Sequence, residues 1–230
     1  MAGEAKDKRA VVLPLLLGFN GGYVDTMGFL ALQGLFTAHV TGNFVTLGAS
    51  LALGTSGALS KLLALPVFCV VVILSRLLSN TLRHREAPVF RYLLTIMLVL
   101  LIAAAVLAVR LGPFPDGDHW AAIVTGMILV SAMAVQNAAH RVHLASLPPS
   151  TLMTGTTTQI MLDLADLIYG SSAVDTAARS RLARMSMMVA VFALGCGTAA
   201  LLHVQIGVWS FAAPPVVAML SLVVRGSATP

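Results

Sequence analysis

The chain has 230 residues, of which 58% are hydrophobic and only 10% are charged. A soluble domain carries about a quarter charged residues, so this composition excludes a soluble protein and indicates a polytopic membrane protein. The formal net charge of +5 does not indicate nucleic-acid binding, because the Lys and Arg residues lie in short clusters between apolar segments. Orientation in a bilayer requires such clusters.

Six apolar segments have about the 20 residues that a membrane-spanning helix needs. In chain order they are 11–33, 62–82, 91–111, 120–141, 182–204 and 207–225. Two further segments, 41–55 and 151–168, are shorter and more polar, and each follows a break in the helical pattern. Pro148 and Pro149 mark the second break, because proline cannot continue a helix.

The basic clusters indicate how many of these segments cross. They lie at the N-terminus, at 83–91, at 140–143 and at 179–184, and positive loops mark the cytoplasmic side. All four clusters share one side only if 41–55 and 151–168 are re-entrant and do not cross. The sequence therefore predicts six transmembrane helices, two re-entrant helices and cytoplasmic termini. Eight crossings, the alternative, would scatter positive charge over both faces.

A similar arrangement occurs twice. Thr41-Gly42-Asn43 follows a helix that carries Asp25, and Thr154-Gly155-Thr156 follows a helix that carries Gln136 and Asn137. Each half then reads as span, re-entrant segment, span, span. Because three spans per repeat are an odd number, residues 1–113 and 114–230 are predicted to be inverted repeats. Inverted repeats with interrupted helices are typical of secondary transporters, whose substrates bind near the bilayer midplane.

The two Thr-Gly motifs could form the binding site. Thr and Asn are good N-cap residues, Gly lets the backbone approach a ligand, and a helix N-terminus favours an anion. We expect both motifs to face one small solute as half-helix N-termini. Alternatively, they are ordinary helix caps within a bundle.

The polar residues on the long helices have similar alternatives. A carboxylate at membrane depth is a functional hypothesis by default, so Asp25 is predicted to couple protons or contact substrate; otherwise it is a protonated acid bonded to a neighbouring Thr or carbonyl group. Gln136 and Asn137 bind substrate or bond helix to helix. His39 is expected to be structural.

Several other residues have simpler expected roles. The first span carries a Gly18–Gly22 pair and is crowded with small residues, namely Gly18, Gly21, Gly22 and Gly28, so this helix is expected to pack against the re-entrant segments. Arg141 is expected to set topology. Asp163 and Asp166 are expected to form a solvated face; the alternative is a salt-bridged gate with one of the arginines at 179, 181 and 184. No nucleophile–base motif, metal spacing or phosphate loop occurs, so we expect no enzyme activity, cofactor or metal.

Two stretches, "GYVDTMGFLALQGLFTAHVTGNFVTLG" and "QNAAHRVHLASLPPSTLMTGTTTQ", resemble the YoaK-like, or DUF1275, family of small bacterial inner-membrane proteins. The resemblance implies that location and no particular activity. The facing half-helices also look like the core of sulfate-permease and uracil-permease transporters. Those proteins have many more spans, so transport by this chain suggests a homodimer.

The sequence thus predicts a secondary transporter of a small polar or anionic metabolite, with proton coupling through Asp25. The alternatives are a membrane sensor or scaffold that does not transport, and a small channel. The expected partners are a small solute and the lipid bilayer. The predicted substrate-binding residues are Asp25, Thr41, Gly42, Asn43, Gln136, Asn137, Thr154, Gly155 and Thr156.

Overall fold

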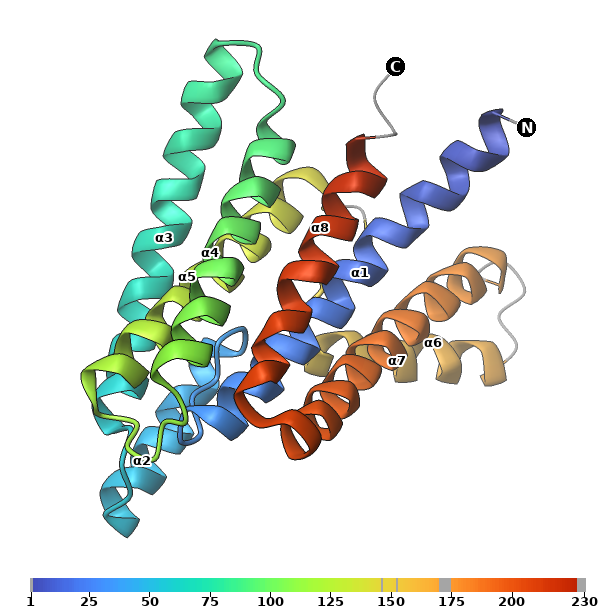
Figure 1. Ribbon diagram of the computed structural model, residues 1–230. Helices are drawn as coiled ribbons and strands as arrows, with labels where there is room; N and C mark the ends of the chain where they lie inside the picture. Colours follow the sequence, from blue (N-terminus) through green and yellow to red (C-terminus); the bar gives the residue numbers. More distant parts are fainter. Residues whose placement is uncertain (1, 146, 152, 170–174, 227–230) are drawn as a thin grey trace.

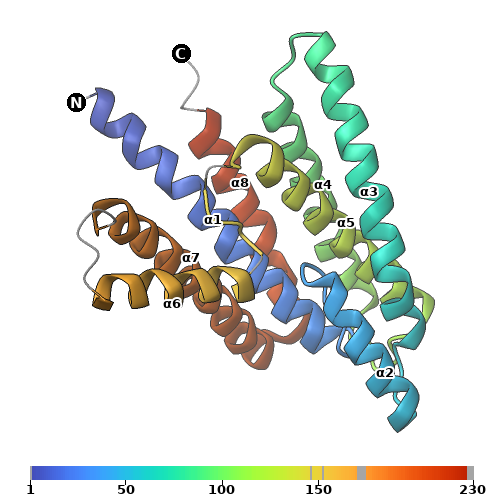
Figure 2. The same ribbon diagram turned by 180° about the vertical axis from the view of Figure 1, so that it is seen from behind.

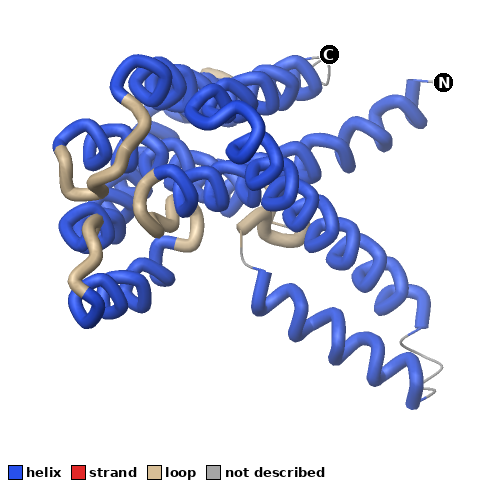
Figure 3. The backbone as a smooth tube through the Cα atoms, turned by 60° about the horizontal axis from the view of Figure 1, so that its bottom comes forward, coloured by secondary structure: helices blue, strands red, loops and turns tan. Residues whose placement is uncertain are grey.

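The computed structural model describes residues 2–145, 147–151, 153–169 and 175–226, which form helices and loops without a β-strand (Figures 1 and 3). The predicted all-α class is therefore confirmed. The helices are α1 (Ala2–Ala31), η1 (Val40–Gly42), α2 (Asn43–Leu53), α3 (Ala58–His84), α4 (Val89–Leu111), α5 (Trp120–His143), α6 (Met153–Tyr169), α7 (Asp175–Ile206), η2 (Gly207–Ala212) and α8 (Ala213–Gly226).

Each apolar segment of the sequence corresponds to a helix, and the two short polar segments correspond to α2 and α6. The segment 207–225 differs, because it starts with the 3-10 helix η2 before α8. Gly207 has a positive φ of 55° at this point, a conformation that glycine adopts without strain. It lets the chain turn back between α7 and α8 (Figure 1).

Four stretches of the described chain are long and apolar enough to cross a membrane. Three are α3, α4 and α5, and the fourth is the 47-residue run Ala178–Val224. Large apolar side chains are also highly exposed, among them Val45 at 75%, Ile168 at 79% and Val204 at 84%. Soluble monomers rarely expose apolar surface on this scale, so the structure agrees with a membrane protein.

The long helices form two packed groups, which do not follow chain order. Helix α5 packs against α3 and α4, helix α1 packs against α7 and α8, and contacts of α4 with α8 and of α1 with α5 join the groups. The short helix α2 packs on α3, and α6 packs on α7. Both termini and the α3–α4 connection lie at one end of the molecule, whereas α2, the α4–α5 connection and η2 lie at the other (Figures 1 and 2).

Glycines allow α1 and α7 to lie backbone against backbone. A Cβ atom added at Gly22 would overlap the carbonyl oxygen of Phe192, and one added at Gly195 would overlap that of Phe19. Gly18 faces the side chain of Met188 on the same helix, α7. Gly18 and Gly22 therefore contribute to the contact with α7 and not to the expected contact with the re-entrant segments.

Two other glycines of α1 do make that contact. A Cβ atom at Gly21 would lie 3.1 Å from the carbonyl oxygen of Ser150, just before α6, and one at Gly28 would lie 3.2 Å from that of Leu35, before η1. Small residues thus bring α1 close both to α7 and to the segments that precede the two short helices.

Candidate functional site

Asp25 of α1 organises the bend between α1 and η1. After α1 the chain reverses at Gln33 and Gly34, which have positive φ angles of 54° and 83°. Oδ1 of Asp25 accepts hydrogen bonds from the backbone N–H groups of Thr37 at 2.8 Å and Ala38 at 2.7 Å. Only 4% of Asp25 is exposed. The carboxylate therefore anchors the bend from inside.

His39 completes the contacts of this carboxylate. Its Nδ1 lies 2.6 Å from Oδ2 of Asp25, and its backbone N–H lies 3.3 Å from Oδ1. Bonding to an ionised carboxylate requires Nδ1 to carry the hydrogen. His39 was expected to be structural, and this pairing makes it the direct partner of the acid in α1. Coupling of Asp25 to protons stays a prediction.

Asn43 closes the same bend from its other side. Its side-chain Nδ2 donates to the carbonyl oxygen of Phe36 at 2.8 Å, and its Oδ1 accepts from the Phe36 N–H at 2.9 Å. Asn43 is 2% exposed, and the ring of Phe36 covers Gly42. No side chain caps the start of η1 or α2, so the predicted N-cap role of Thr41 and Asn43 is wrong. Asn43 is the first residue of α2. Both polar atoms of the Asn43 side-chain amide bond to the backbone of Phe36.

In the second half, Gln136 is fully buried where α5 crosses α1. Its Nε2 donates to the carbonyl oxygen of Leu17 at 2.9 Å, and its Oε1 accepts from Nδ2 of Asn20 at 2.9 Å. These contacts correspond to the helix-to-helix alternative.

Asn137 faces the segment before α6. Its Oδ1 accepts from the hydroxyl of Thr151 at 2.6 Å, and its Nδ2 donates to the Met133 carbonyl oxygen of its own helix at 2.9 Å. In both halves, a polar side chain of the long helix thus holds the segment that leads into the short helix.

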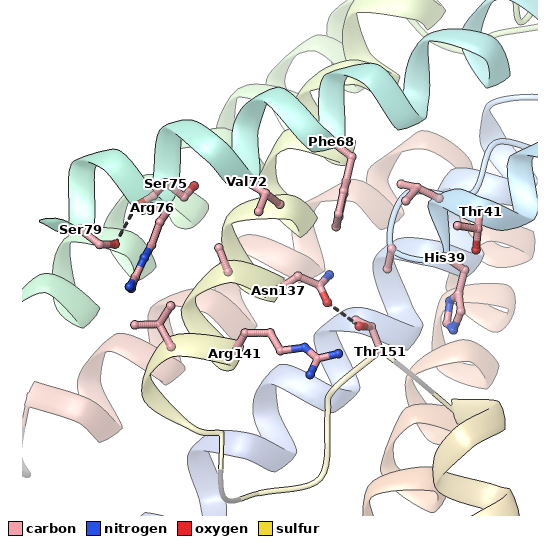
Figure 4. A pocket seen from close by; sticks show the side chains of 14 residues that line it. His39, Thr41, Phe68, Val72, Ser75, Arg76, Ser79, Asn137, Arg141 and Thr151 are labelled. Carbon is pink, nitrogen blue, oxygen red and sulfur yellow. Dashed lines mark hydrogen bonds between the residues drawn. The ribbon is translucent and has the colours of Figure 1, made fainter.

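A cavity of about 430 Å³ lies between α3, α5 and both of these segments (Figure 4). Thr41 and Asn137 line it, so two of the predicted site residues, one from each half, meet there. His39 and Thr151 also contribute to its wall. We call this space the arginine cavity, because it contains Arg76 and Arg141.

The two arginines come from opposing helix faces. Arg76 lies on α3 beside Ser75 and Ser79, and Arg141 lies on α5 one turn after Asn137. Within the described chain, neither guanidinium makes an ion pair with an acidic side chain, and no described acidic residue lines the cavity. The cavity is therefore suited to a negatively charged solute. Arg141 was expected only to set topology, and the structure adds this position on the cavity wall.

A second cavity, of about 450 Å³, shares His39 with the arginine cavity. Asp25, Thr26 and Cys196 line it, together with the rings of Phe29, Phe36 and Phe192. His39 therefore borders both cavities, whereas its partner Asp25 lines only the second.

The motif of the second half lies apart from both cavities. Thr154 and Gly155 are exposed on α6, and Thr156 is buried at 4% exposed. None of the three lines the arginine cavity or the second cavity, and Thr154 faces a shallow groove on the outer side of α6. The structure therefore does not bring the two Thr-Gly motifs to one space.

One of the acidic residues of α6 is paired. Asp163 is fully buried and accepts two hydrogen bonds from the guanidinium of Arg181, one of them of 2.7 Å from Nε. The pair joins α6 to α7, whereas Asp166 is exposed. The prediction of a solvated face is wrong for Asp163, because α6 turns this residue toward α7.

Comparison with known proteins identifies the family. A family model described as "Protein of unknown function (DUF1275)" matches residues 13–224. The chain belongs to the DUF1275 family. No curated protein and no solved structure matches it significantly. The DUF1275 match covers the bend after α1, the segment before α6 and both short helices, so the features described above lie within the family region.

In this DUF1275 chain, sequence reasoning missed Arg76, Ser75 and Ser79. The signal was present, because Arg76 interrupts the apolar segment 62–82 and lies next to Ser75 and three residues before Ser79. An arginine inside a predicted span is a functional hypothesis by the same argument that singled out Asp25.

Proposed function

We propose that the protein is a secondary transporter of a small polar or anionic metabolite in the bacterial inner membrane. In this proposal α1, α3, α4, α5, α7 and α8 cross the bilayer, α2 and α6 are re-entrant, and residues 1–113 and 114–230 are inverted repeats. The solute binds in the arginine cavity, and the Asp25–His39 pair couples its movement to protons.

The packing of the helices supports the repeats. In the proposed correspondence α1, α2, α3 and α4 match α5, α6, α7 and α8. The contact of α1 with α7 then matches that of α5 with α3, and α1 on α8 matches α5 on α4. Likewise, α2 on α3 matches α6 on α7. This agreement is independent of the Thr-Gly motifs from which the repeat was first inferred.

Length and charge support six crossings. The run Ala178–Val224 has 47 residues, about 70 Å as one straight helix, which is more than twice the roughly 30 Å hydrocarbon core. Since the run turns back at η2 (Figure 1), it supplies two crossings. The basic residues at 83–91 lie at the same end as both termini, which supports cytoplasmic termini.

The observation that carries the proposal is the composition of the arginine cavity. It combines Thr41 from the first bend with Asn137 and Thr151 from the second half. In secondary transporters the solute site lies between repeats, beside interrupted helices. A cavity between the halves, with polar groups from both, has this position.

Purified protein in sealed proteoliposomes tests the proposal. A thermal-shift screen of anions, amino acids and nucleobases first selects a ligand, and uptake of that ligand is then followed with and without an inward proton gradient. We expect uptake that the gradient increases and that Asn137→Ala reduces. Thr95→Val is the control, because Thr95 is exposed on α4 and bonds only within its helix.

Three outcomes would contradict the proposal. Binding without uptake would favour a sensor, and uptake that saturates at no tested concentration would favour a channel. Absence of any ligand from the screen would favour a scaffold.

A homodimer is also part of the proposal, and the mass of the detergent-solubilised protein by light scattering tests it.

A further inference from the structure

We infer that the arginine cavity binds an amphiphilic organic carboxylate, with its acidic group between Arg76 and Arg141 and its apolar body against α3 and α5. The inference rests on the proposed function for its place in a transport cycle, and it goes further by naming the charged residues and the ligand class. It also assigns anion binding to the side chains of Arg76 and Arg141, in place of the backbone of the Thr-Gly motifs.

Charge is the first argument. Arg76 and Arg141 face one cavity without a described acidic residue in its wall. Two like charges around a shared, partly enclosed space favour an anion, and guanidinium groups match the planar geometry of a carboxylate. Figure 4 shows Arg141 extending from α5 toward the Asn137–Thr151 hydrogen bond and Arg76 extending from α3 toward α5.

Depth is the second argument. Arg76 lies eight residues before the end of α3 at His84, about 12 Å along the helix axis. Basic residues that only set topology are expected in the loops or the last turn, as with Arg83. Arg76 lies two turns deeper and, like Ser75 and Ser79, lines the cavity.

The apolar wall is the third argument. Phe68 and Val72 of α3, Val40 of the first bend, and Ala138 and Val142 of α5 make up much of the lining. A fully hydrated inorganic anion would leave these groups in contact with water. An organic anion satisfies both parts of the cavity, because an apolar pocket with a few convergent polar groups is the usual form of a small-molecule site. The volume of about 430 Å³ admits a molecule of that kind.

Matched probes test the ligand class. Benzoate and benzamide have similar shape and differ in charge, whereas acetate keeps the charge and lacks the apolar body. Calorimetric titration of the purified full-length protein is expected to show benzoate binding, with benzamide and acetate each weaker by roughly tenfold or more. Equal binding of benzoate and benzamide, or no benzoate binding, would overturn the inference.

Variants test the two arginines. The R76Q/R141Q protein is expected to lose benzoate affinity by roughly tenfold or more, and the R76K/R141K protein, which keeps its charge and topology signal, is expected to lie between. R83Q/R85Q is the matched control, because it removes the same charge at the cytoplasmic end outside the cavity. Unchanged benzoate affinity in R76Q/R141Q would overturn the inference.

Two further arms separate the possible failures. An anionic lipid headgroup has the same charge, so titration is repeated in nanodiscs with and without phosphatidylglycerol; occupation by this lipid alone would overturn the inference. Arginine-dependent benzoate binding without uptake in proteoliposomes would leave the site in place and refute transport. Proton-driven uptake of another solute by R76Q/R141Q would support transport and refute this site.

Discussion

Replacing Asp25 by Asn should loosen the first bend while leaving side-chain volume unchanged. In the native protein one carboxylate accepts from the N–H groups of Thr37 and Ala38 at 2.8 and 2.7 Å, and from His39 Nδ1 at 2.6 Å. The amide keeps one oxygen for the backbone donors. Its nitrogen is a donor and cannot accept from Nδ1–H.

The magnitude follows from these three bonds. A hydrogen bond to a charged group contributes about 1.5–3 kcal/mol and a neutral one about 0.5–1.5. Weakening two bonds by about 1.2 kcal/mol each and losing the third, about 2.2 kcal/mol, therefore costs about 5 kcal/mol. For a chain of this size, 1 kcal/mol corresponds to a melting-temperature change of about 2–4 °C, so Asp25→Asn should melt about 10–20 °C lower.

Thermal unfolding in detergent measures this shift, and Asp166→Asn is the matched control, because Asp166 is exposed on α6. The same two proteins in proteoliposomes test coupling: uptake by Asp25→Asn should no longer respond to the proton gradient. A melting temperature equal to that of Asp166→Asn would refute the anchoring role of the carboxylate. Gradient-driven uptake at the native rate would remove Asp25 from coupling.

Three further changes test the packing and the loops by thermal unfolding. Gly195→Ala should cost about 1–3 kcal/mol through overpacking against α1, whereas Gly197→Ala, with open space around it, should be neutral or stabilise by up to about 1 kcal/mol; equal effects would contradict the close helix contact. Asn43→Ala removes both bonds to the Phe36 backbone and should cost about 2 kcal/mol. A native melting temperature would show that the bend does not depend on these two hydrogen bonds. Asp118→Ala removes the acceptor for two N–H groups at the start of α3 and should cost about 1 kcal/mol, more than Asp116→Ala; the reverse order would rule out the cap.

Hydropathy and the polar, glycine and proline residues between apolar segments predicted the helices well. A helix in contact with lipid must make all its backbone hydrogen bonds internally and be apolar over most of its length. The segments 41–55 and 151–168 were recognised as different for the same reason. Polar side chains and Thr-Gly sequences make a segment a poor membrane span. Both segments form short helices, α2 and α6, that pack on a neighbouring helix.

The side-chain partners were less accessible from sequence. Whether Asn43 faces a solute or the Phe36 backbone depends on how the chain reverses after α1. The residue types at Gln33 and Gly34, where the chain reverses, do not predict the direction that the chain takes. The association of Arg76 with Arg141 depends on α3 lying beside α5, which is a long-range contact. Periodicity places residues on a face of a helix and does not say which helix that face meets.

The two packed groups of helices have a consequence for how this chain can assemble. The first half contributes α1 to the group that otherwise comes from the second half, and the second half contributes α5 in return. A fragment cut in the α4–α5 connection would expose the faces of both donated helices, so neither fragment closes a core alone. Two copies of one fragment could bury these exposed faces only by exchanging their first helices, as in a domain-swapped dimer. In the proposed inverted-repeat arrangement, the single chain corresponds to two intertwined antiparallel subunits joined covalently.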